Sequence, residues 1–329
     1  MALVRRTKPK TTPAVPGKPP FAPAPPPVGM IGLGIMGSAM AENLLKAGYA
    51  VHGFDPLKTQ TKRLAKLGGT VHVNVAGMAT QCEYFLLSLP SVLALDKVAR
   101  ELAEHGRPGS VVAELSTLPI AAKEQARVTL AAAGMVLLDC PLSGTGEQAK
   151  SRDLAVYASG DAKAIRRCEA IFPGFARVTY NVGSFGNGMQ MKLVANLLVA
   201  IHNVSTAEAL LMGTRMGLDA KTMVHVLADG AGGSRMFQVR GPVMAERSWD
   251  KATMKVEVWK KDMGLIADAL RDLAVPAPLF SATLPVYHAA MALGHAQDDT
   301  ACVYDVLEQW AAPVAKKRSG AVARKTSKK

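Results

Sequence analysis

Short apolar runs alternate with longer helical patterns through the first half of the chain. The runs lie at about residues 28–31, 49–54, 71–73, 84–90, 110–117 and 135–141. Alternation of this kind is typical of a parallel sheet whose two faces are covered by helices. We therefore predict a Rossmann-type, doubly wound α/β domain over residues 28–185.

The second half of the chain shows helical patterns and no strand pattern. Residues 189–216 form one run nearly free of helix breakers, and Gly217 follows as its expected C-terminal cap. At 1.5 Å per residue this helix is a rod of roughly 40 Å, long enough to link two domains or to cross a dimer interface. We predict an all-α domain over residues 186–312, joined to the first domain by this helix.

A glycine-rich turn follows the first apolar run. In a nucleotide-binding fold, Gly32 permits the tight turn, Gly34 lets the backbone approach a pyrophosphate, and Gly37 lets helix and strand pack closely. The helix that begins there offers free N–H groups to the phosphates. The predicted dinucleotide contacts are Gly32, Leu33, Gly34, Ile35, Met36 and Gly37.

Asp55 ends the second apolar run, about 20 residues beyond these glycines, where an acid commonly contacts the adenosine ribose. A carboxylate there can accept hydrogen bonds from the ribose hydroxyls and would repel a 2′-phosphate. The position favours NAD over NADP. NADP is not excluded, because Lys58 could attract a phosphate and Asp55-Pro56 could simply be a turn.

Ligands of doubly wound sheets lie beyond the carboxyl ends of the strands. Leu89, Pro90 and Thr117 end two of the predicted runs, so they fall where the nicotinamide is expected, although each is also compatible with ordinary turn chemistry. Ser143 and Gly144 follow the last run. A hydroxyl and unhindered backbone N–H groups at a strand end are suited to gripping a carboxylate.

Lys192 lies among methionine, leucine and valine at the start of the long helix, and Asn196 follows one turn later on the same face. A lysine at a helix start is usually a solvated charge. An ammonium held against apolar walls, however, has a lowered pKa and can exchange a proton near neutral pH. Such a group suits hydride transfer, in which the substrate hydroxyl must lose its proton. Asn196 could orient either the substrate or the lysine.

The formal net charge of +13 is carried by the two ends of the chain. Residues 1–27 contain five lysines and arginines, residues 313–329 contain seven, and neither segment contains an acid. We predict a disordered Pro-rich basic arm over 1–27 and a disordered basic tail over 313–329. Prolines in the arm argue against a targeting helix. Nucleic acid is expected to bind at most nonspecifically, through these segments.

Cysteine and histidine are scattered along the chain. The four cysteines form no CxxC pair and the seven histidines no HExxH pair, which argues for a reducing compartment and against a metal site. No uninterrupted apolar run reaches the roughly 18 to 20 residues that cross a bilayer. We expect a soluble, cytoplasmic protein without a membrane partner.

Taken together, four separated motifs resemble those of the 3-hydroxyisobutyrate dehydrogenase family of β-hydroxyacid dehydrogenases, which includes tartronate semialdehyde reductases. The resemblance extends from about residue 28 to residue 311. Asp299 is a weaker fifth match. The four motifs are GLGIMGSAMAENLLKAG, DCPLSGTGEQA, GNGMQMKLVAN and KDMGL.

The resemblance implies that Lys192 is the catalytic acid and base, and that Lys261 reaches the cofactor from the helical domain. Ser143, Gly144 and Asn196 are implied to hold the substrate. Leu89, Pro90 and Thr117 are implied to line the nicotinamide site. Because members of the family are commonly dimers or tetramers, a homodimer or homotetramer is implied as well.

The chain departs from the family pattern around the substrate. Thr145 stands where a second glycine is common and adds a branched side chain and a hydroxyl to the pocket wall. Gln148 and Arg152 replace a glycine-containing turn. Arg235 lies in a region that shapes specificity in the family, where it could clamp a second carboxylate or be a surface residue.

These observations predict an NAD(P)-dependent dehydrogenase of short 3-hydroxy acids such as 3-hydroxyisobutyrate, glycerate with tartronate semialdehyde, or a threonate-like acid. An imine reductase is one alternative, although such enzymes commonly lack the lysine. A catalytically silent dehydrogenase fold acting as a nucleic-acid adaptor is the other, and an intact pair of Lys192 and Asn196 argues against it.

Overall fold

The computed structural model describes residues 25–311. The predicted basic tail over 313–329 lies outside the described residues, as does nearly all of the predicted arm over 1–27. The predicted boundary between residues 185 and 186 stays a prediction.

The first half folds around a six-stranded, fully parallel sheet in the order β3-β2-β1-β4-β5-β6. The order reverses at β1, as in a doubly wound fold. The strands are β1 (Val28–Ile31), β2 (Val51–Phe54), β3 (Thr70–Val71), β4 (Tyr84–Leu87), β5 (Val111–Glu114) and β6 (Val136–Asp139). Each predicted run overlaps a strand. Most runs extend further, because their last residues belong to the turns at the sheet edge.

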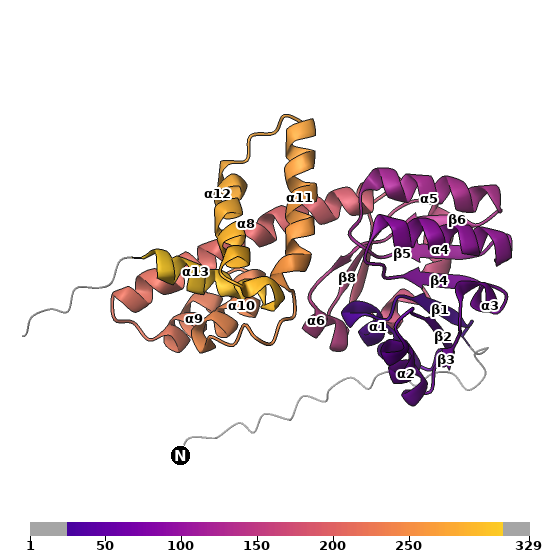
Figure 1. Cartoon of the computed structure of the whole chain (residues 1–329), viewed down its shortest axis with the longest axis horizontal. Coiled ribbons are helices and arrows are strands. Elements are labelled where there is room, and N and C mark those ends of the chain that lie inside the picture. Colours follow the sequence, from indigo (N-terminus) through magenta and orange to yellow (C-terminus); the bar gives the residue numbers. More distant parts are fainter. Residues whose placement is uncertain (1–24, 312–329) are drawn as a thin grey trace, which may run out of the picture.

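Helices cover both faces of this sheet (Figure 1). One face packs against α3 (Val75–Ala79), α4 (Val92–His105) and α5 (Ile120–Ala132). The other face packs against α1 (Ile35–Lys46), with α2 (Lys58–Lys66) beside it. The doubly wound α/β prediction is therefore confirmed.

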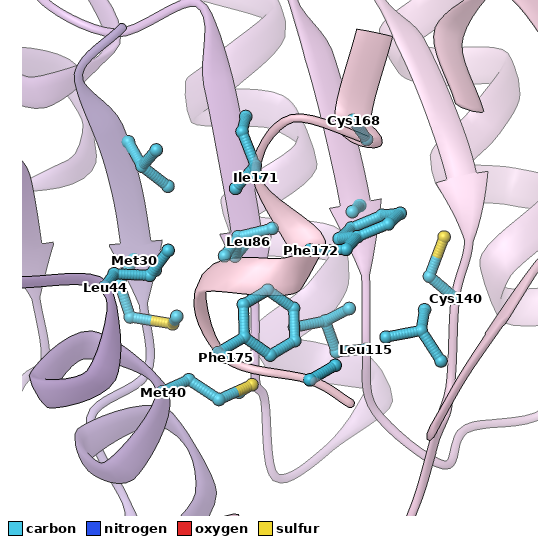
Figure 2. Close-up of a cluster of buried hydrophobic side chains, with 14 of the residues drawn as sticks. Met30, Met40, Leu44, Leu86, Leu115, Cys140, Cys168, Ile171, Phe172 and Phe175 are labelled. Carbon is cyan, nitrogen blue, oxygen red and sulfur yellow. The ribbon is translucent and has the colours of Figure 1, made fainter. Parts of the chain in front are cut away.

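The second face is completed by a short turn that carries two phenylalanines. Phe172 begins the 3₁₀ turn η1 (Phe172–Gly174), and Phe175 is the residue after it. The two rings meet edge to face, with their centroids 5.9 Å apart. Figure 2 shows both rings over the strands, in the cluster that contains Met40 and Leu86. This buried cluster joins the main sheet to the segment that leads toward the second domain.

A small three-stranded sheet, β7-β8-β9, was not predicted. Its strands are β7 (Leu142–Ser143), β8 (Ala155–Ala158) and β9 (Val178–Asn181). Two further helices lie between them, α6 (Gly146–Lys150) and α7 (Ala162–Cys168). The small sheet places Ser143 and Gly144 at its edge.

The long helix is observed as α8 (Asn187–Arg215), and Gly217 follows it with a φ of +93°. It leaves the edge of the first domain and runs through the middle of the second (Figure 1). Around it pack α9 (Ala220–Asp229), α10 (Arg235–Glu246), α11 (Val256–Asp272), α12 (Pro278–Ala292) and α13 (Val303–Trp310). The 3₁₀ turns η2 (His295–Gln297) and η3 (Thr300–Cys302) complete the domain. The all-α prediction is confirmed.

Among the described residues, α8 is the one helix long and apolar enough to cross a membrane by length and composition alone. Polar residues interrupt its sequence, so α8 contains no uninterrupted apolar run of that length. The core helix of a soluble domain passes the same test, and α8 has other helices packed around it.

A buried ion pair organises the loops of the helical domain. Nη1 of Arg240 lies 2.8 Å from both carboxylate oxygens of Asp299, and both side chains are almost fully buried. Asp299 also accepts hydrogen bonds from the backbone N–H groups of Thr253, Met254 and Ala301. The residue singled out as the weaker family match thus ties α10 to two loops.

We expect Asp299→Ala to lower the free energy of unfolding by about 3–5 kcal/mol, because it leaves the Arg240 guanidinium buried without a counter-charge. Chemical denaturation followed by circular dichroism measures this. The control is Glu147→Gln, which removes a surface ion pair with Lys150 and should leave stability near that of the wild type. Equal stability of the two variants would contradict the assigned role of Asp299.

Candidate active site

A cleft of about 620 Å³ lies between the small sheet and the helical domain. Its walls come from the turn after β7, from the first half of α8 and from the start of α10. All of the predicted catalytic and substrate residues line it: Ser143, Gly144, Thr145, Lys192 and Asn196. Residues more than 50 positions apart in the sequence are thus brought to one cavity, as expected.

The turn after β7 is held in shape by a helix cap. Thr145 caps α6 in a capping box: its hydroxyl accepts from the N–H of Gln148, and its own N–H donates to the Gln148 side chain. Gly144 has a φ of +135°, and a Cβ there would lie 2.6 Å from Leu154. Within residues 25–311, the hydroxyl of Ser143 and the N–H of Gly144 have no hydrogen-bond partner. They are the groups this turn offers to a ligand.

The Gln148 and Arg152 departures from the family pattern have a structural explanation. Gln148 completes the capping box, and its side-chain amide also contacts Asp153. Arg152 adopts a φ of +60°, the left-handed conformation that glycine would supply more easily. The turn is therefore retained with an arginine in place of a glycine.

Lys192 is 8% exposed and faces the cleft from the second turn of α8. Burial lowers the pKa of its ammonium; the Asp262 carboxylate opposes this effect and Lys261 adds to it. Asn196, which is also buried, donates its side-chain amide to Asp262 at 3.0 Å. The predicted residues Lys192 and Asn196 are therefore joined by an acidic residue, Asp262.

Asp262 was not singled out in the sequence, although it stands next to Lys261 in the KDMGL motif. Its pKa is raised by burial, while Lys261 and Lys192 pull it down. One oxygen, Oδ2, accepts from Asn196, and the other, Oδ1, lies 3.6 Å from the Lys261 ammonium. Its position opposite α8 depends on how α11 packs, which residue spacing does not show.

Lys261 reaches across from the helical domain to the nucleotide-binding fold. It stands on α11, and its ammonium donates to the backbone carbonyl of Thr117 at 2.6 Å. The structure thus brings together two residues that were predicted to lie near the cofactor. Arg235 and Asp153 form an ion pair across the cleft, with Nη2 of Arg235 lying 2.6 Å from Oδ2 of Asp153.

The glycine-rich turn has the clearances that a dinucleotide requires. A Cβ on Gly32 would lie 2.1 Å from the Ser88 carbonyl, and one on Gly37 would lie 1.9 Å from the carbonyl of Gly32. A Cβ on Gly34, by contrast, would meet no atom within 4 Å. Two glycines are therefore needed for packing, while the third leaves open space at the N-terminus of α1.

The remaining predicted cofactor residues gather at this same edge of the sheet. Asp55 accepts from the N–H of Leu33 at 2.8 Å and so ties the turn to the end of β2. Leu33 is buried, Met36 is half-buried and Ile35 is exposed. Leu89 and Pro90 follow β4, which is paired in register with β1 and β5.

No group of three or more histidine, cysteine, aspartate or glutamate side chains that could hold a metal ion occurs between residues 25 and 311.

A dinucleotide turn on a doubly wound sheet, in a molecule whose cleft holds a buried lysine, is an arrangement suited to a nicotinamide-dependent dehydrogenase. The family model of the NAD-binding domain of 6-phosphogluconate dehydrogenase matches residues 27–183. The model of the NAD-binding domain of NADP-dependent 3-hydroxyisobutyrate dehydrogenase matches residues 186–307. The chain belongs to the 3-hydroxyisobutyrate dehydrogenase family, as predicted.

Two relatives illustrate the relationship. The L-threonate dehydrogenase of Cupriavidus necator is 30% identical over 85% of this chain and 95% of its own length. The NAD-dependent L-serine dehydrogenase of Pseudomonas aeruginosa is 28% identical over 85% of this chain and 97% of its own length. The chain is thus similar to enzymes that oxidise hydroxy acids.

The solved structure of Mycobacterium tuberculosis 3-hydroxyisobutyrate dehydrogenase with L-serine is 26% identical and superposes with a TM-score of 0.76. It covers 86% of this chain and 99% of its own. A Pseudomonas imine reductase, at 17% identity and a TM-score of 0.59, shares the fold alone. The protein is an NAD(P)-dependent hydroxyacid dehydrogenase.

We expect Gly34→Ala to fold like the wild type but to bind NAD at least about ten-fold more weakly, because the new methyl group fills the space left for the pyrophosphate. Gly37→Ala is the matched variant. Its methyl group collides with the backbone of the apo protein, so its melting temperature should fall without any ligand. Thermal melts and NAD titration by calorimetry separate the two. A Gly34→Ala protein with wild-type affinity would contradict the assignment of the turn.

Proposed function

We propose that the protein interconverts a short 3-hydroxy acid and the corresponding 3-oxo acid, which is a semialdehyde where the hydroxyl is primary, with Lys192 as the general base in oxidation and the general acid in reduction. One comparison carries this proposal. The described residues contain three buried cations: Lys123, Lys192 and Arg240. Lys123 and Arg240 each form ion pairs at 2.8 Å or less, whereas Lys192 has no carboxylate within 4 Å among residues 25–311.

A buried ammonium without a contacting counter-charge is unfavourable, so its lowered pKa is the expected result. Lys192 also faces the cleft, unlike the fully enclosed Lys123. These two properties suit a group that exchanges a proton with a substrate. The nearby Asp262 carboxylate favours the protonated form and so keeps both states within reach.

The substrate carboxylate is proposed to lie on the free hydroxyl of Ser143 and the free N–H of Gly144. Thr145 would contribute shape, because its hydroxyl is engaged in the capping box. Asn196, held by Asp262, would orient the substrate hydroxyl toward the Lys192 amine. NAD, when bound, accepts the hydride.

The proposed cofactor contacts follow the sequence prediction. The turn Gly32–Gly37 would hold the pyrophosphate, and Asp55 would meet the ribose and favour NAD over NADP. Leu89, Pro90 and Thr117 would line the nicotinamide site. Lys261 would approach the cofactor from the position at which it now contacts Thr117.

The mouth of the cleft favours a substrate with a polar or acidic distal group. Asp153 accepts from Arg177 at 2.8 Å and from Arg235 at 2.6 Å, and all three residues line the cleft. One carboxylate between two guanidiniums leaves a net positive charge. Arg235 is thus both a surface residue and a cleft residue. Among the predicted substrates, a threonate-like acid, which carries further hydroxyl groups, suits this mouth better than 3-hydroxyisobutyrate, whose one further substituent is a methyl group.

A homo-oligomer in the cytoplasm is proposed as the working form. Exposed apolar side chains on the first half of α8 support self-association, and they include Met191, Val194 and Leu198. The four cysteines are all free thiols, as expected in a reducing compartment.

Lys192→Met should lower kcat by about 10²–10⁴-fold in both directions while NAD binding persists. In the wild type, oxidation should rise with pH through the pKa of Lys192, which burial lowers from that of an ordinary lysine, because the neutral amine is the base. Reduction should fall over the same range, because it needs the ammonium. Initial rates from pH 6 to 10 in both directions test this. Parallel pH profiles in the two directions, or a fully active Met variant, would rule out Lys192.

Arg235→Met should lower kcat/KM several-fold for L-threonate and leave kcat/KM for 3-hydroxyisobutyrate nearly unchanged, because only the first substrate has distal polar groups. The control is Arg271→Met, which removes an exposed guanidinium on α11. Steady-state kinetics with both acids gives the ratio of kcat/KM for L-threonate to kcat/KM for 3-hydroxyisobutyrate in each variant. A similar loss on both substrates would mean that Arg235 only supports the fold of the cleft.

A further inference from the structure

A fully buried lysine outside the cleft, Lys123 on α5, contacts carboxylates at the ends of two strands. Its ammonium lies 2.7 Å from Oε2 of Glu114 on β5 and 2.6 Å from Oδ1 of Asp139 on β6. None of the three side chains is exposed. Burial alone would lower the pKa of Lys123, but the two carboxylates outweigh it and raise that pKa. Lys123 is therefore a permanent buried cation.

The second oxygen of Asp139 holds the start of the catalytic helix. Oδ2 accepts from the N–H of Met189 at 2.8 Å. The Ser159 hydroxyl lies 2.9 Å from the backbone carbonyl oxygen of Asp139 and 3.2 Å from its Oδ2, and donates to this residue. That hydroxyl oxygen in turn accepts from the N–H of Gly188 at 3.0 Å. These N–H groups belong to the first turn of α8. The N–H groups of a first helical turn have no carbonyl acceptor within the helix, so they need partners from outside it. The Asp139 carboxylate therefore lies at the N-terminus of α8, where the helix dipole stabilises negative charge.

The contact between α8 and the strands is also close. A Cβ on Gly188 would lie 2.5 Å from the carbonyl oxygen of Tyr157 and 2.6 Å from that of Asp139. No side chain separates the helix from the strand ends. A small movement of Asp139 would consequently be transmitted to the backbone of α8, and Lys192 follows one turn later.

The second oxygen of Glu114 connects Lys123 to the loops of the proposed nicotinamide site. Oε1 accepts from the N–H of Ser116 at 2.9 Å, and the Ser116 hydroxyl accepts from the N–H of Leu89 at 2.7 Å. This branch fixes the loops after β4 and β5 relative to each other. Lys123 is thus joined both to the helix of the proposed base and to the proposed nicotinamide loop.

Electrostatics makes both branches depend on the lysine. One ammonium and two carboxylates leave a single negative charge, which the N-terminus of α8, equivalent to roughly half a positive charge, partly offsets. Without Lys123, two carboxylates would share a buried space in which both cannot readily ionise. A protonated Asp139 is a weaker acceptor for the helix N–H groups.

We propose that Lys123 is a positioning residue for hydride transfer: its ammonium holds Asp139 as the anion that anchors α8, and so sets where Lys192 meets the substrate. Through Glu114 it also holds the loop at Leu89. The inference rests on the proposed function of Lys192 as the acid and base.

Asp139→Asn and Glu114→Gln form a matched pair that tests this. Each replaces one carboxylate by an isosteric amide and leaves Lys123 with one carboxylate, so the net charge is the same in both. We expect Asp139→Asn to lower kcat about ten-fold or more, to shift the pH profile of kcat, and to speed amide exchange in residues 187–192. Glu114→Gln should mainly raise KM for NAD and leave exchange in 187–192 unchanged.

Lys123→Met should show the changes in kcat, pH profile and exchange expected of Asp139→Asn as well as the higher KM for NAD expected of Glu114→Gln. Glu124→Gln, an exposed change on the same helix, should show none of them. Steady-state kinetics per folded enzyme and hydrogen exchange by mass spectrometry supply the readouts. If Lys123→Met does not fold, the two amide variants decide the question. Lower melting temperatures with unchanged kcat, pH profile and exchange in 187–192 would show a merely structural role and overturn the proposal.

The exchange measurement needs no substrate, so it separates two kinds of failure. If the wild type oxidised no hydroxy acid, the proposed function would fail. If the wild type were active and exchange in residues 187–192 were the same in Asp139→Asn, Lys123→Met and wild type, the anchor itself would be refuted.

Discussion

The junction between the first turn of α8 and the edge of the parallel sheet determines the geometry of the site. Gly188 lies against strand carbonyls with no room for a side chain, and its N–H and that of Met189 are bound by Ser159 and Asp139. Because α8 also forms the centre of the helical domain, this contact sets the position of one domain on the other. The cleft and the orientation of Lys192 are consequences of it.

Buried charge distinguishes the structural from the reactive groups. Burying a cation is costly unless a counter-charge contacts it, and Lys123 and Arg240 both meet that condition. Lys192 does not, and its lowered pKa is the physical result. Buried carboxylates thus pair with the cations that hold elements together, while the Lys192 ammonium in the cleft, the proposed acid and base, is left without one.

The parts of the site that could be predicted from the sequence are those that lie close together in it. The glycine turn with Asp55 is a local pattern, and Lys192 drew attention because its immediate neighbours are apolar. Asp262, Lys123 and the small sheet could not be found in this way. Helical spacing does not reveal that Lys123 faces inward, because its partners Glu114 and Asp139 belong to strands paired through long-range contacts.

The two sides of the cleft are held together with different strength. At the start of α8 the contacts are buried, charged and without solvent, so each hydrogen bond there is protected from competition by water. At the mouth, Arg235 on Asp153 and Lys261 on Thr117 bridge the domains with partly exposed side chains, and exposed ion pairs contribute little. The buried contacts at the start of α8 therefore fix the position of the proposed base, Lys192, relative to the proposed nicotinamide site. The exposed side chains at the mouth remain available to the substrate and the cofactor.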